Sequence, residues 1–481
     1  MCITGSITMR HRFFLPAAIL ALLVSIPVLA DEKPAEDQPL SYFKDIRPIF
    51  QANCQGCHQP AKRGGEYVMT AFDLLLSEGE SGEAAIVPGK PAESYLISQI
   101  TPSDGEAEMP KGKDPLAAVE IELISRWISE GAKDDTPASA RVVFDAEHPP
   151  TYQASPVITS VNYSPDGTLL AVSGYHEVLL HRADGSGLHG RLIGMSARIE
   201  SARFSPDGKK LVACGGSPGR FGEIQVWDVE KLQLLYSINH GYDTLYGASW
   251  SPDGKMIGFG CPDNTIRGIQ AATGKQALFN GAHSDWVLDT VFSTKSDHLI
   301  TVSRDRSMKL IKVDTQRFVD NITSITPGAL KGGLHAVARH PTKDELLNGG
   351  ADGTPRIYKM IRDKARKIGD DYNLIRAFPQ MPGRLFAVSF SHDGNRIAAG
   401  SSFNGTGEVR VYNYADAAVV STFEVPGGGI YSVDFSHDNK TIAAAGFDGQ
   451  VYLVNAETGE LIKAFIPVTV SETVATTGNE Q

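Results

Sequence analysis

The sequence predicts a two-domain protein in which a small all-α domain near the N-terminus precedes an all-β propeller of seven blades. Two observations lead to this fold class. Apolar residues recur at helical spacing between residues 41 and 135. Beyond residue 156, one turn motif recurs seven times, once in every forty-odd residues. Four short strands in such an interval make one propeller blade. The chain of 481 residues is long enough for two domains with their own cores.

Residues 1–30 have the pattern of a secretory signal peptide. Two arginines precede an apolar run at residues 13–29, and small residues lead to a cleavage site after Ala30. The alternative is an uncleaved membrane anchor, because the run is close to the shortest length that spans a bilayer. We expect cleavage, which would release a protein into a periplasmic or otherwise exported location.

The motif Cys54-Gln55-Gly56-Cys57-His58 is typical of covalent haem attachment. Two thiols three residues apart can add to the two vinyl groups of a porphyrin, and the following histidine can serve as the proximal iron ligand. A zinc site would need two further Cys or His ligands nearby, but the next ones along the chain are His148 and Cys214. The motif therefore predicts one covalent haem c per chain. It agrees with export, since such haem is attached outside the cytoplasm.

Helical segments are expected on both sides of the motif, within a domain at residues 41–135. Apolar residues at helical spacing lead from Phe43 to the motif, although Pro48 requires that helix to begin late or to bend. Further helices are expected at residues 71–78, 91–100 and 116–130, the last ending before Gly131. A helix at each end, with the motif closing the first, is the plan of a small class I cytochrome c.

The second axial ligand of the iron is expected to be Met109. A thioether is the usual partner of histidine in cytochromes c, and Met109 lies before Pro110 in a polar loop that can fold over an open haem face. Met69 follows an apolar segment and is better explained as core filler. Lys111 or Lys113 as the ligand, or an open sixth position, are the remaining alternatives.

Residues 42–135 resemble the planctomycete-type cytochrome c domain. The elements that carry the resemblance are Asp45-Ile46-Arg47-Pro48-Ile49-Phe50, Gly64-Gly65, Val87-Pro88-Gly89-Lys90-Pro91, Met109-Pro110 and Trp127-Ile128 with Gly131-Ala132. This sequence departs from the family at residues 67–70, where the family tends to have a Leu-Asp pair. The resemblance implies a haem-binding, electron-transferring domain.

A proline-rich linker at residues 136–156 precedes the repeats, which occupy residues 157–468. Their turns begin at Ser164, Ser205, Ser251, Ser293, His340, Ser391 and Ser436. This period resembles that of WD40 repeats, although only Trp227-Asp228 has the WD pair. Seven blades complete in themselves are expected, with residues 141–144 as a candidate clasp and residues 469–481 as a disordered tail.

Several propeller residues invite a functional interpretation. Asp263, Asp305, Asp352 and Asp448 lie between the second and third strands of their blades and are expected to be turn residues. Larger loops at residues 175–177, 215–222 and 403–407 are expected on one rim, a candidate surface for a protein partner. Cys214 and Cys261 are expected to be buried free thiols.

The negative charge is concentrated in the N-terminal domain. The whole chain has a net charge of −11, whereas residues 31–135 contain 10 basic and 20 acidic residues, a net charge of −10. This excess is explained by solubility, or by a redox partner with a basic docking face. No basic surface for nucleic acid is indicated.

The sequence therefore favours an exported electron-transfer protein whose propeller binds a partner, rather than an enzyme. One alternative is a redox enzyme resembling the cytochrome cd1 nitrite reductases, in which a propeller carries a second cofactor. The other is a haem-based sensor or a scaffold. Fold analogy alone does not separate them, and neither the redox partner nor the propeller ligand can be named from the sequence.

Overall fold

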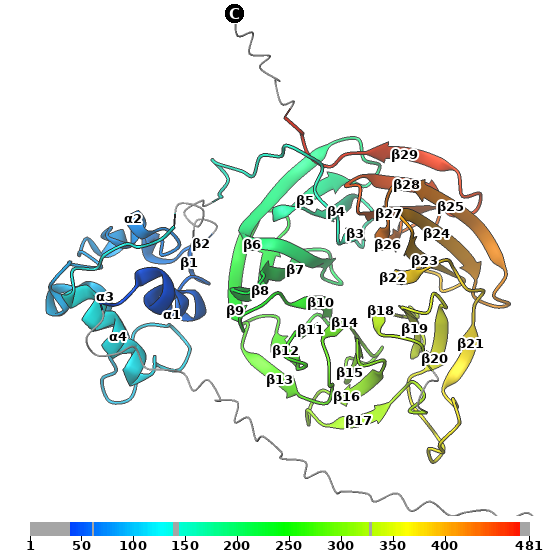
Figure 1. The fold of residues 1–481 in the computed structure, drawn as a ribbon, viewed down its shortest axis with the longest axis horizontal. Helices are drawn as coiled ribbons and strands as arrows, with labels where there is room; N and C mark the ends of the chain where they lie inside the picture. The colour runs from blue at the N-terminus through cyan, green and yellow to red at the C-terminus, as the bar shows by residue number, and fades with distance from the viewer. Residues whose placement is uncertain (1–38, 60–61, 138–143, 327–329, 472–481) are drawn as a thin grey trace, which may run out of the picture.

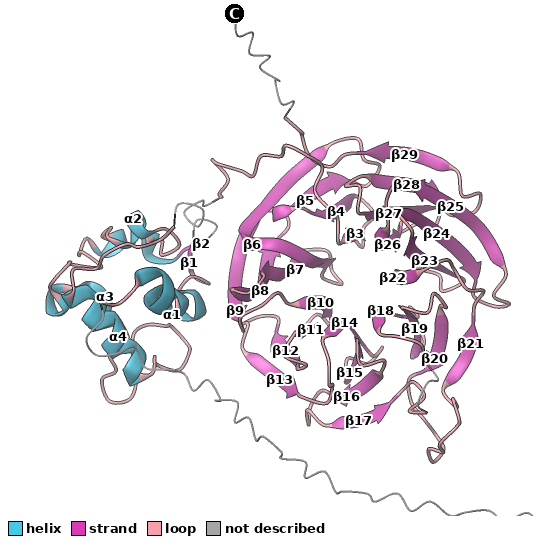
Figure 2. Cartoon of the chain, viewed as in Figure 1, coloured by secondary structure: helices cyan, strands magenta, loops and turns pink. Residues whose placement is uncertain are grey.

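The computed structural model describes residues 39–59, 62–137, 144–326 and 330–471. It shows a small, mainly helical unit beside a ring of β-sheets (Figure 1; Figure 2). The predicted signal peptide lies outside the described residues. None of the helices in the described ranges is long and apolar enough to cross a membrane.

Short helices and two very short strands make up the helical unit. They are η1 (Tyr42–Ile46), α1 (Arg47–Asn53), β1 (His58–Gln59), β2 (Lys62–Arg63), η2 (Gly64–Glu66), α2 (Phe72–Leu75), η3 (Gly79–Ser81), η4 (Pro91–Glu93), α3 (Tyr95–Ile100) and α4 (Ala118–Ser129). Pro48 lies in the first turn of α1, where no backbone N–H is required. Gly131, with φ of 100°, follows the end of α4.

One apolar core holds the helical unit together. Trp127 of α4 stacks on Tyr42 with ring centroids 5.4 Å apart, and Phe50 of α1 meets the same indole edge-on. Ile124 and Ile128 are buried beside them, whereas Ile121 is only partly buried. The helix at each end of the unit thus packs against the other, as their apolar faces predicted.

The ring consists of seven groups of four antiparallel strands. Blade 1 contains β3 (Val161–Tyr163), β4 (Leu169–Ser173), β5 (Tyr175–Arg182) and the first part of β6 (Leu188–Phe204); blade 2 contains the rest of β6, β7 (Lys210–Ser217), β8 (Phe221–Asp228) and β9 (Gln233–His240). Blade 3 contains β10 (Tyr246–Trp250), β11 (Met256–Gly260), β12 (Ile266–Gln270) and β13 (Gln276–Asn280); blade 4 contains β14 (Val287–Phe292), β15 (His298–Ser303), β16 (Met308–Lys312) and β17 (Phe318–Asn321).

The remaining blades have the same order. Blade 5 contains β18 (Leu334–Arg339), β19 (Glu345–Gly350), β20 (Arg356–Lys359) and β21 (Leu374–Ala377); blade 6 contains β22 (Arg384–Phe390), β23 (Arg396–Phe403), β24 (Thr406–Asn413) and β25 (Val419–Pro426); blade 7 contains β26 (Ile430–Phe435), β27 (Thr441–Gly446), β28 (Val451–Asn455) and β29 (Leu461–Phe465). Within the described residues, each blade consists of strands that are consecutive in the chain, in agreement with the sequence prediction. The first strand of each blade lies innermost and the fourth outermost in Figure 1.

The recurring turn has a physical basis that is visible in blade 1. Ser164 Oγ donates to Asp166 Oδ1 at 2.5 Å and accepts the Leu169 N–H at 2.9 Å, while Gly167 has φ of 72°. The serine and aspartate therefore close the turn, and glycine supplies the left-handed residue.

The ring is tied to the linker by its last described residues. Tyr152 forms a parallel bridge with Val470, and the Ser471 N–H donates to the Tyr152 carbonyl at 2.8 Å. The ordered chain thus extends beyond the boundary expected at residue 468. The candidate clasp at residues 141–144 lies outside the described residues except for Phe144.

Candidate functional site

The two cysteines of the motif lie on the turn that follows α1. The Cys54 N–H continues the helix by donating to the Phe50 carbonyl at 2.8 Å, and the Cys57 and His58 N–H groups both donate to the Cys54 carbonyl at 3.1 Å. Both thiols are free, with Cys57 exposed and Cys54 half-buried. Burial raises the pKa of the Cys54 thiol to about 12. The turn thus presents two unpaired thiols together with the imidazole.

The His58 ring is oriented by a backbone carbonyl. Its Nδ1 lies 3.3 Å from the Tyr67 carbonyl oxygen, and the rings of the two residues meet edge-on at 5.7 Å. The Tyr67 hydroxyl in turn donates to the Leu75 carbonyl at 2.7 Å. With the proton on Nδ1, the Nε2 lone pair is available to a metal. Burial lowers the pKa of His58, which favours the neutral, ligating imidazole.

Gly64 makes room for this arrangement. A Cβ at residue 64 would lie 3.1 Å from the Cys57 carbonyl oxygen and 3.4 Å from His58 Cε1. The Met69 N–H donates to the His58 carbonyl at 2.8 Å, which fixes the segment after the glycines against the motif. Glycine at position 64 therefore lets the loop backbone lie close to the Cys57 carbonyl and the His58 ring.

The two variable positions of the motif have separate structural roles. Gln55 is buried, and its side-chain amide donates to the Met69 carbonyl at 2.7 Å. Gly56 faces the propeller: a Cβ there would lie 2.4 Å from the Ser237 carbonyl oxygen. Sequence reasoning assigned no structural role to Gln55, Gly56, Gly64 or Tyr67, and only the Gly64-Gly65 pair was a visible signal.

The donor set and its surroundings fit a covalently bound haem. Two free thiols and an oriented imidazole lie beside an apolar cluster that Cys54 itself contacts. That cluster includes Leu75, Ile86, Leu96, Ile100 and Leu116. No group of three or more His, Cys, Asp or Glu that could hold a metal ion gathers among the described residues.

The structure places Met109 and Met69 against the same apolar cluster. Met69 is almost fully buried, as expected of core filler, whereas Met109 is half-buried in its loop. The Met109 N–H donates to the Gln99 carbonyl at 2.9 Å, which ties the loop to α3. Lys111 and Lys113 are exposed. The choice of Met109 as distal ligand stays a prediction.

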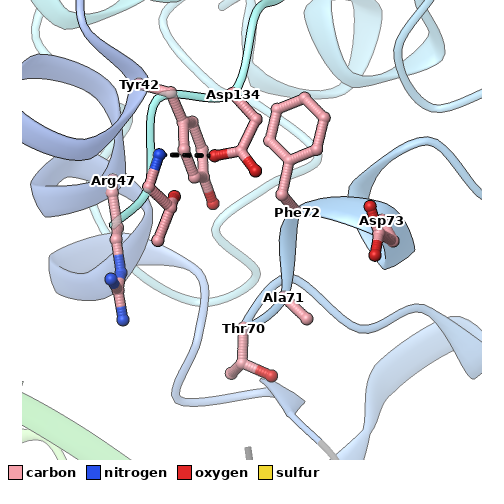
Figure 3. Close-up of a pocket in the computed structure, with 8 residues that line it drawn as sticks. Tyr42, Arg47, Thr70, Ala71, Phe72, Asp73 and Asp134 are labelled. Carbon is pink, nitrogen blue, oxygen red and sulfur yellow. Dashed lines mark hydrogen bonds between the residues drawn. The ribbon is translucent and has the colours of Figure 1, made fainter. Parts of the chain in front are cut away.

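A small pocket in the helical unit is separate from the motif. Figure 3 shows residues that line it, among them Tyr42, Arg47, Asp134 and the segment from Thr70 to Asp73. Its volume is about 60 Å³.

The candidate aspartates of the propeller are turn residues, as predicted. The side chain of each accepts the backbone N–H two residues further on, from Thr265, Ser307, Thr354 and Gln450 respectively. Asp305 also lies 2.8 Å from His283 Nδ1, which holds blade 4 together. Cys214 and Cys261 are buried free thiols, as expected.

One candidate rim residue is structural. Glu177 is fully buried and accepts two hydrogen bonds from Arg191, at 2.6 and 2.7 Å, and one from the Tyr152 hydroxyl at 2.6 Å. Arg191 also donates to the Pro150 carbonyl, so this cluster anchors the linker to blade 1. The expectation that residues 175–177 face a partner is wrong for Glu177, because its carboxylate points into the blade.

The fold and the motif together define a class of protein, a cytochrome c-like unit followed by a β-propeller. The comparisons with known proteins agree: the family described as Planctomycete cytochrome C matches residues 54–112, and the WD domain, G-beta repeat, matches residues 275–312 and 418–455.

Curated relatives match part of this chain. This chain is 28% identical over 237 residues to the eukaryotic translation initiation factor 3 subunit I of Aspergillus terreus, covering 45% of this chain and 66% of the relative. It is 29% identical over 188 residues to coronin-7 of Bos taurus, covering 36% and 20% respectively. The matches span less than two thirds of either relative.

Proposed function

We propose that this chain is an exported electron-transfer protein that carries one covalent haem c. Cys54 and Cys57 would form the thioethers, His58 the proximal bond to iron and Met109 the distal bond. The propeller would serve protein interaction. The observation that carries the proposal is the contact between His58 Nδ1 and the Tyr67 carbonyl, beside two free thiols.

The residues of the chain hold and shield the group rather than react. When bound, a haem supplies one-electron chemistry between ferric and ferrous iron. Tyr67 orients the imidazole, Gln55 ties the turn to the segment that carries Met69, and the apolar cluster excludes water. A class I-like cytochrome c arrangement of terminal helices supports this assignment.

The propeller is proposed as a platform for partner proteins. The name of one relative describes it as a subunit of a translation factor, so a propeller of this kind can belong to a larger assembly. In this chain, the candidate loop at residues 403–407 is the tight turn between β23 and β24, and Phe403 at the end of β23 has 53% of its surface exposed. By contrast, Arg220 of the loop at 215–222 lies over the Phe43 ring of the helical unit at 5.9 Å. The loop at 403–407 is therefore the better candidate for an external partner.

Covalent attachment is tested by expression with a c-type maturation system. Haem that stays with the wild-type chain after acid–acetone extraction, at one haem per chain, is the expected result. Cys54→Ala with Cys57→Ala should abolish it, while Cys214→Ala leaves it unchanged. Haem released from the wild type would overturn the assignment. Protein sequencing of the exported product checks for a mature N-terminus at Asp31.

The distal ligand decides between electron transfer and sensing. Met109→Ala should remove the sulfur–iron charge-transfer band of the oxidised protein, open the iron to carbon monoxide and lower the reduction potential. Met69→Ala is the matched control and should reduce stability only. A wild type without that band would favour the haem-based sensor.

A further inference from the structure

The outer strand of blade 2, β9, lies against the haem-attachment motif. Lys62 Nζ donates to the Leu235 carbonyl at 2.5 Å, and the Asn239 side-chain amide donates to the Gln51 carbonyl. Between these two hydrogen bonds, Gly56 meets the Ser237 carbonyl. In Figure 1 the helical unit lies beside this strand, with α1 and β1 nearest the ring.

These contacts fall on one edge of the strand. In an antiparallel sheet, alternate residues of an edge strand direct both backbone polar groups away from their neighbour. Leu235, Ser237 and Asn239 alternate in this way, and the first two present their carbonyls to the helical unit. We call the outward-facing backbone of these three residues the β9 edge. An exposed strand edge is open to unwanted pairing with other strands, and here the helical unit covers the edge.

Blade 6 shows what an uncovered outer strand looks like. Strand β25 has eight residues, as β9 has, and four of them are exposed: Val419, Thr422, Glu424 and Pro426. In β9 only Gln233, at the end of the strand, is exposed. The difference in exposure indicates that the helical unit shields most of the length of β9.

Gly56 is explained by this contact and by nothing within its own turn. Its backbone is not in the left-handed region, so the conformation does not require glycine. A Cβ would nevertheless lie 2.4 Å from the Ser237 carbonyl oxygen, a backbone atom that cannot turn aside. The second variable position of the motif is thus set by the propeller.

We propose that the β9 edge is a docking surface for the haem-attachment motif of the same chain. It holds the helical unit in one orientation and covers the side of the motif that carries Gly56. An external redox partner then approaches the unit from a side away from blade 2. This last consequence rests on the proposed function, whereas the docking does not require haem.

The test uses hydrogen exchange of the full chain, followed by mass spectrometry. Gly56→Ala should speed the exchange of peptides covering residues 51–59 and 233–240, because the added methyl group displaces the Ser237 carbonyl. Gly187→Ala is the matched control, since its Cβ would meet nothing within 4 Å and its backbone is not left-handed. Small-angle X-ray scattering should show a larger radius of gyration for Gly56→Ala only.

A second variant avoids a change within the motif. Lys62→Ala with Asn239→Ala removes both flanking hydrogen bonds without adding bulk. Each lost bond should weaken docking about 3- to 10-fold, and exchange at the β9 edge should rise accordingly. Unchanged exchange in both folded variants would overturn the proposal. Haem content is measured separately, so a chain that docks without binding haem would refute the proposed function and keep the docking surface.

Discussion

The third strands of blades 2 and 6 share a sequence pattern that contains a buried glutamate, but this glutamate has different partners in the two blades. Blade 2 has Gly222-Glu223-Ile224-Gln225-Val226, and blade 6 has Gly407-Glu408-Val409-Arg410-Val411. In both, the glutamate is buried between the second and fourth strands. In blade 6 it forms an ion pair with Arg410 at 2.5 Å.

The glutamate of blade 2 is held by neutral groups instead. Glu223 accepts hydrogen bonds from Ser196 Oγ at 2.6 Å, from Gln225 Nε2 at 2.7 Å and from Ser237 Oγ. Gln225 also accepts the indole N–H of Trp227 at 3.0 Å. Burial raises the pKa of Glu223, and these donors only partly oppose the rise.

A cation occupies the position of Gln225 in each of blades 3 to 6, where it pairs with the acidic residue of the same blade. The pairs are Arg267–Asp263, Lys309–Asp305, Arg356–Asp352 and Arg410–Glu408. The side chain of Arg410 keeps 17% of its surface exposed, whereas Gln225 is 1% exposed. Because an ion removed from water is costly, a neutral donor suits the covered blade 2, where blades 3 to 6 have a cation.

The largest effect is expected from truncation of that donor. Gln225→Ala should lower the free energy of unfolding by about 3–5 kcal/mol, since it leaves both Glu223 and the Trp227 indole short of a partner and opens a cavity. Arg410→Ala, the equivalent change in blade 6, should cost about 1–2 kcal/mol, because water reaches the remaining carboxylate. Urea midpoints measured by circular dichroism compare the two. An equal or larger loss in Arg410→Ala would contradict the comparison.

The outer strands should differ by a smaller amount. Ser237→Ala removes a hydroxyl donor to a buried carboxyl group and should cost about 1.5–3 kcal/mol. Thr422 pairs with Arg410 across β24 and β25 as Ser237 pairs with Gln225 across β8 and β9, but it is exposed. Thr422→Ala should therefore change stability by less than about 0.5 kcal/mol. Similar midpoint shifts for both variants would show that coverage of β9 has no energetic consequence.

The smallest effect is a difference in pH dependence. The pKa of Glu223 is raised in the folded state, so its contribution to stability is complete below the unfolded pKa, about 4.3, and is lost as pH rises through the folded pKa. Glu223→Gln should remove this loss. The free energy of unfolding of the variant should therefore exceed that of the wild type at pH values above the folded pKa.

Glu408→Gln is the control for this measurement. It leaves Arg410 without its carboxylate and should lose about 1–2 kcal/mol at neutral pH. Unfolding midpoints between pH 4 and pH 8 give the sign for each variant. If both variants shifted the unfolding midpoint in the same direction at pH 8, an uncompensated charge on Glu223 in blade 2 would be ruled out.

Much of the fold was predictable because its signals are local. Pro48 lies in the first turn of α1, which continues directly from η1, so the helical backbone begins earlier than Pro48 suggested. Gly131 follows α4, as predicted. The seven turns agree with the seven four-stranded groups. In blades 1, 2, 3 and 6, serine, aspartate and glycine close the turn through contacts a few residues apart. The role of Glu177 was mistaken, because its partners Tyr152 and Arg191 come from other segments.

The candidate site likewise has features that the sequence predicts and features that only the structure shows. The pattern of Cys54, Cys57 and His58 carries its chemistry in its spacing, whereas the orientation of His58 comes from a carbonyl, which any residue at position 67 can supply. Gly56 matches the motif as an arbitrary residue, and nothing nearby in the sequence indicates that it contacts Ser237.

The sequence by itself determined the motif Cys54-Gln55-Gly56-Cys57-His58, the helical ends of the first unit and the repeat of the propeller, because turns, periodicity and motif spacing act over a few residues. Only the tertiary structure decided which blade meets the motif and how each buried carboxylate is satisfied. The first outcome depends on residues far apart in the chain, such as Gly56 and Ser237. The second depends on partners in the same or a neighbouring strand and on how far each carboxylate is removed from water.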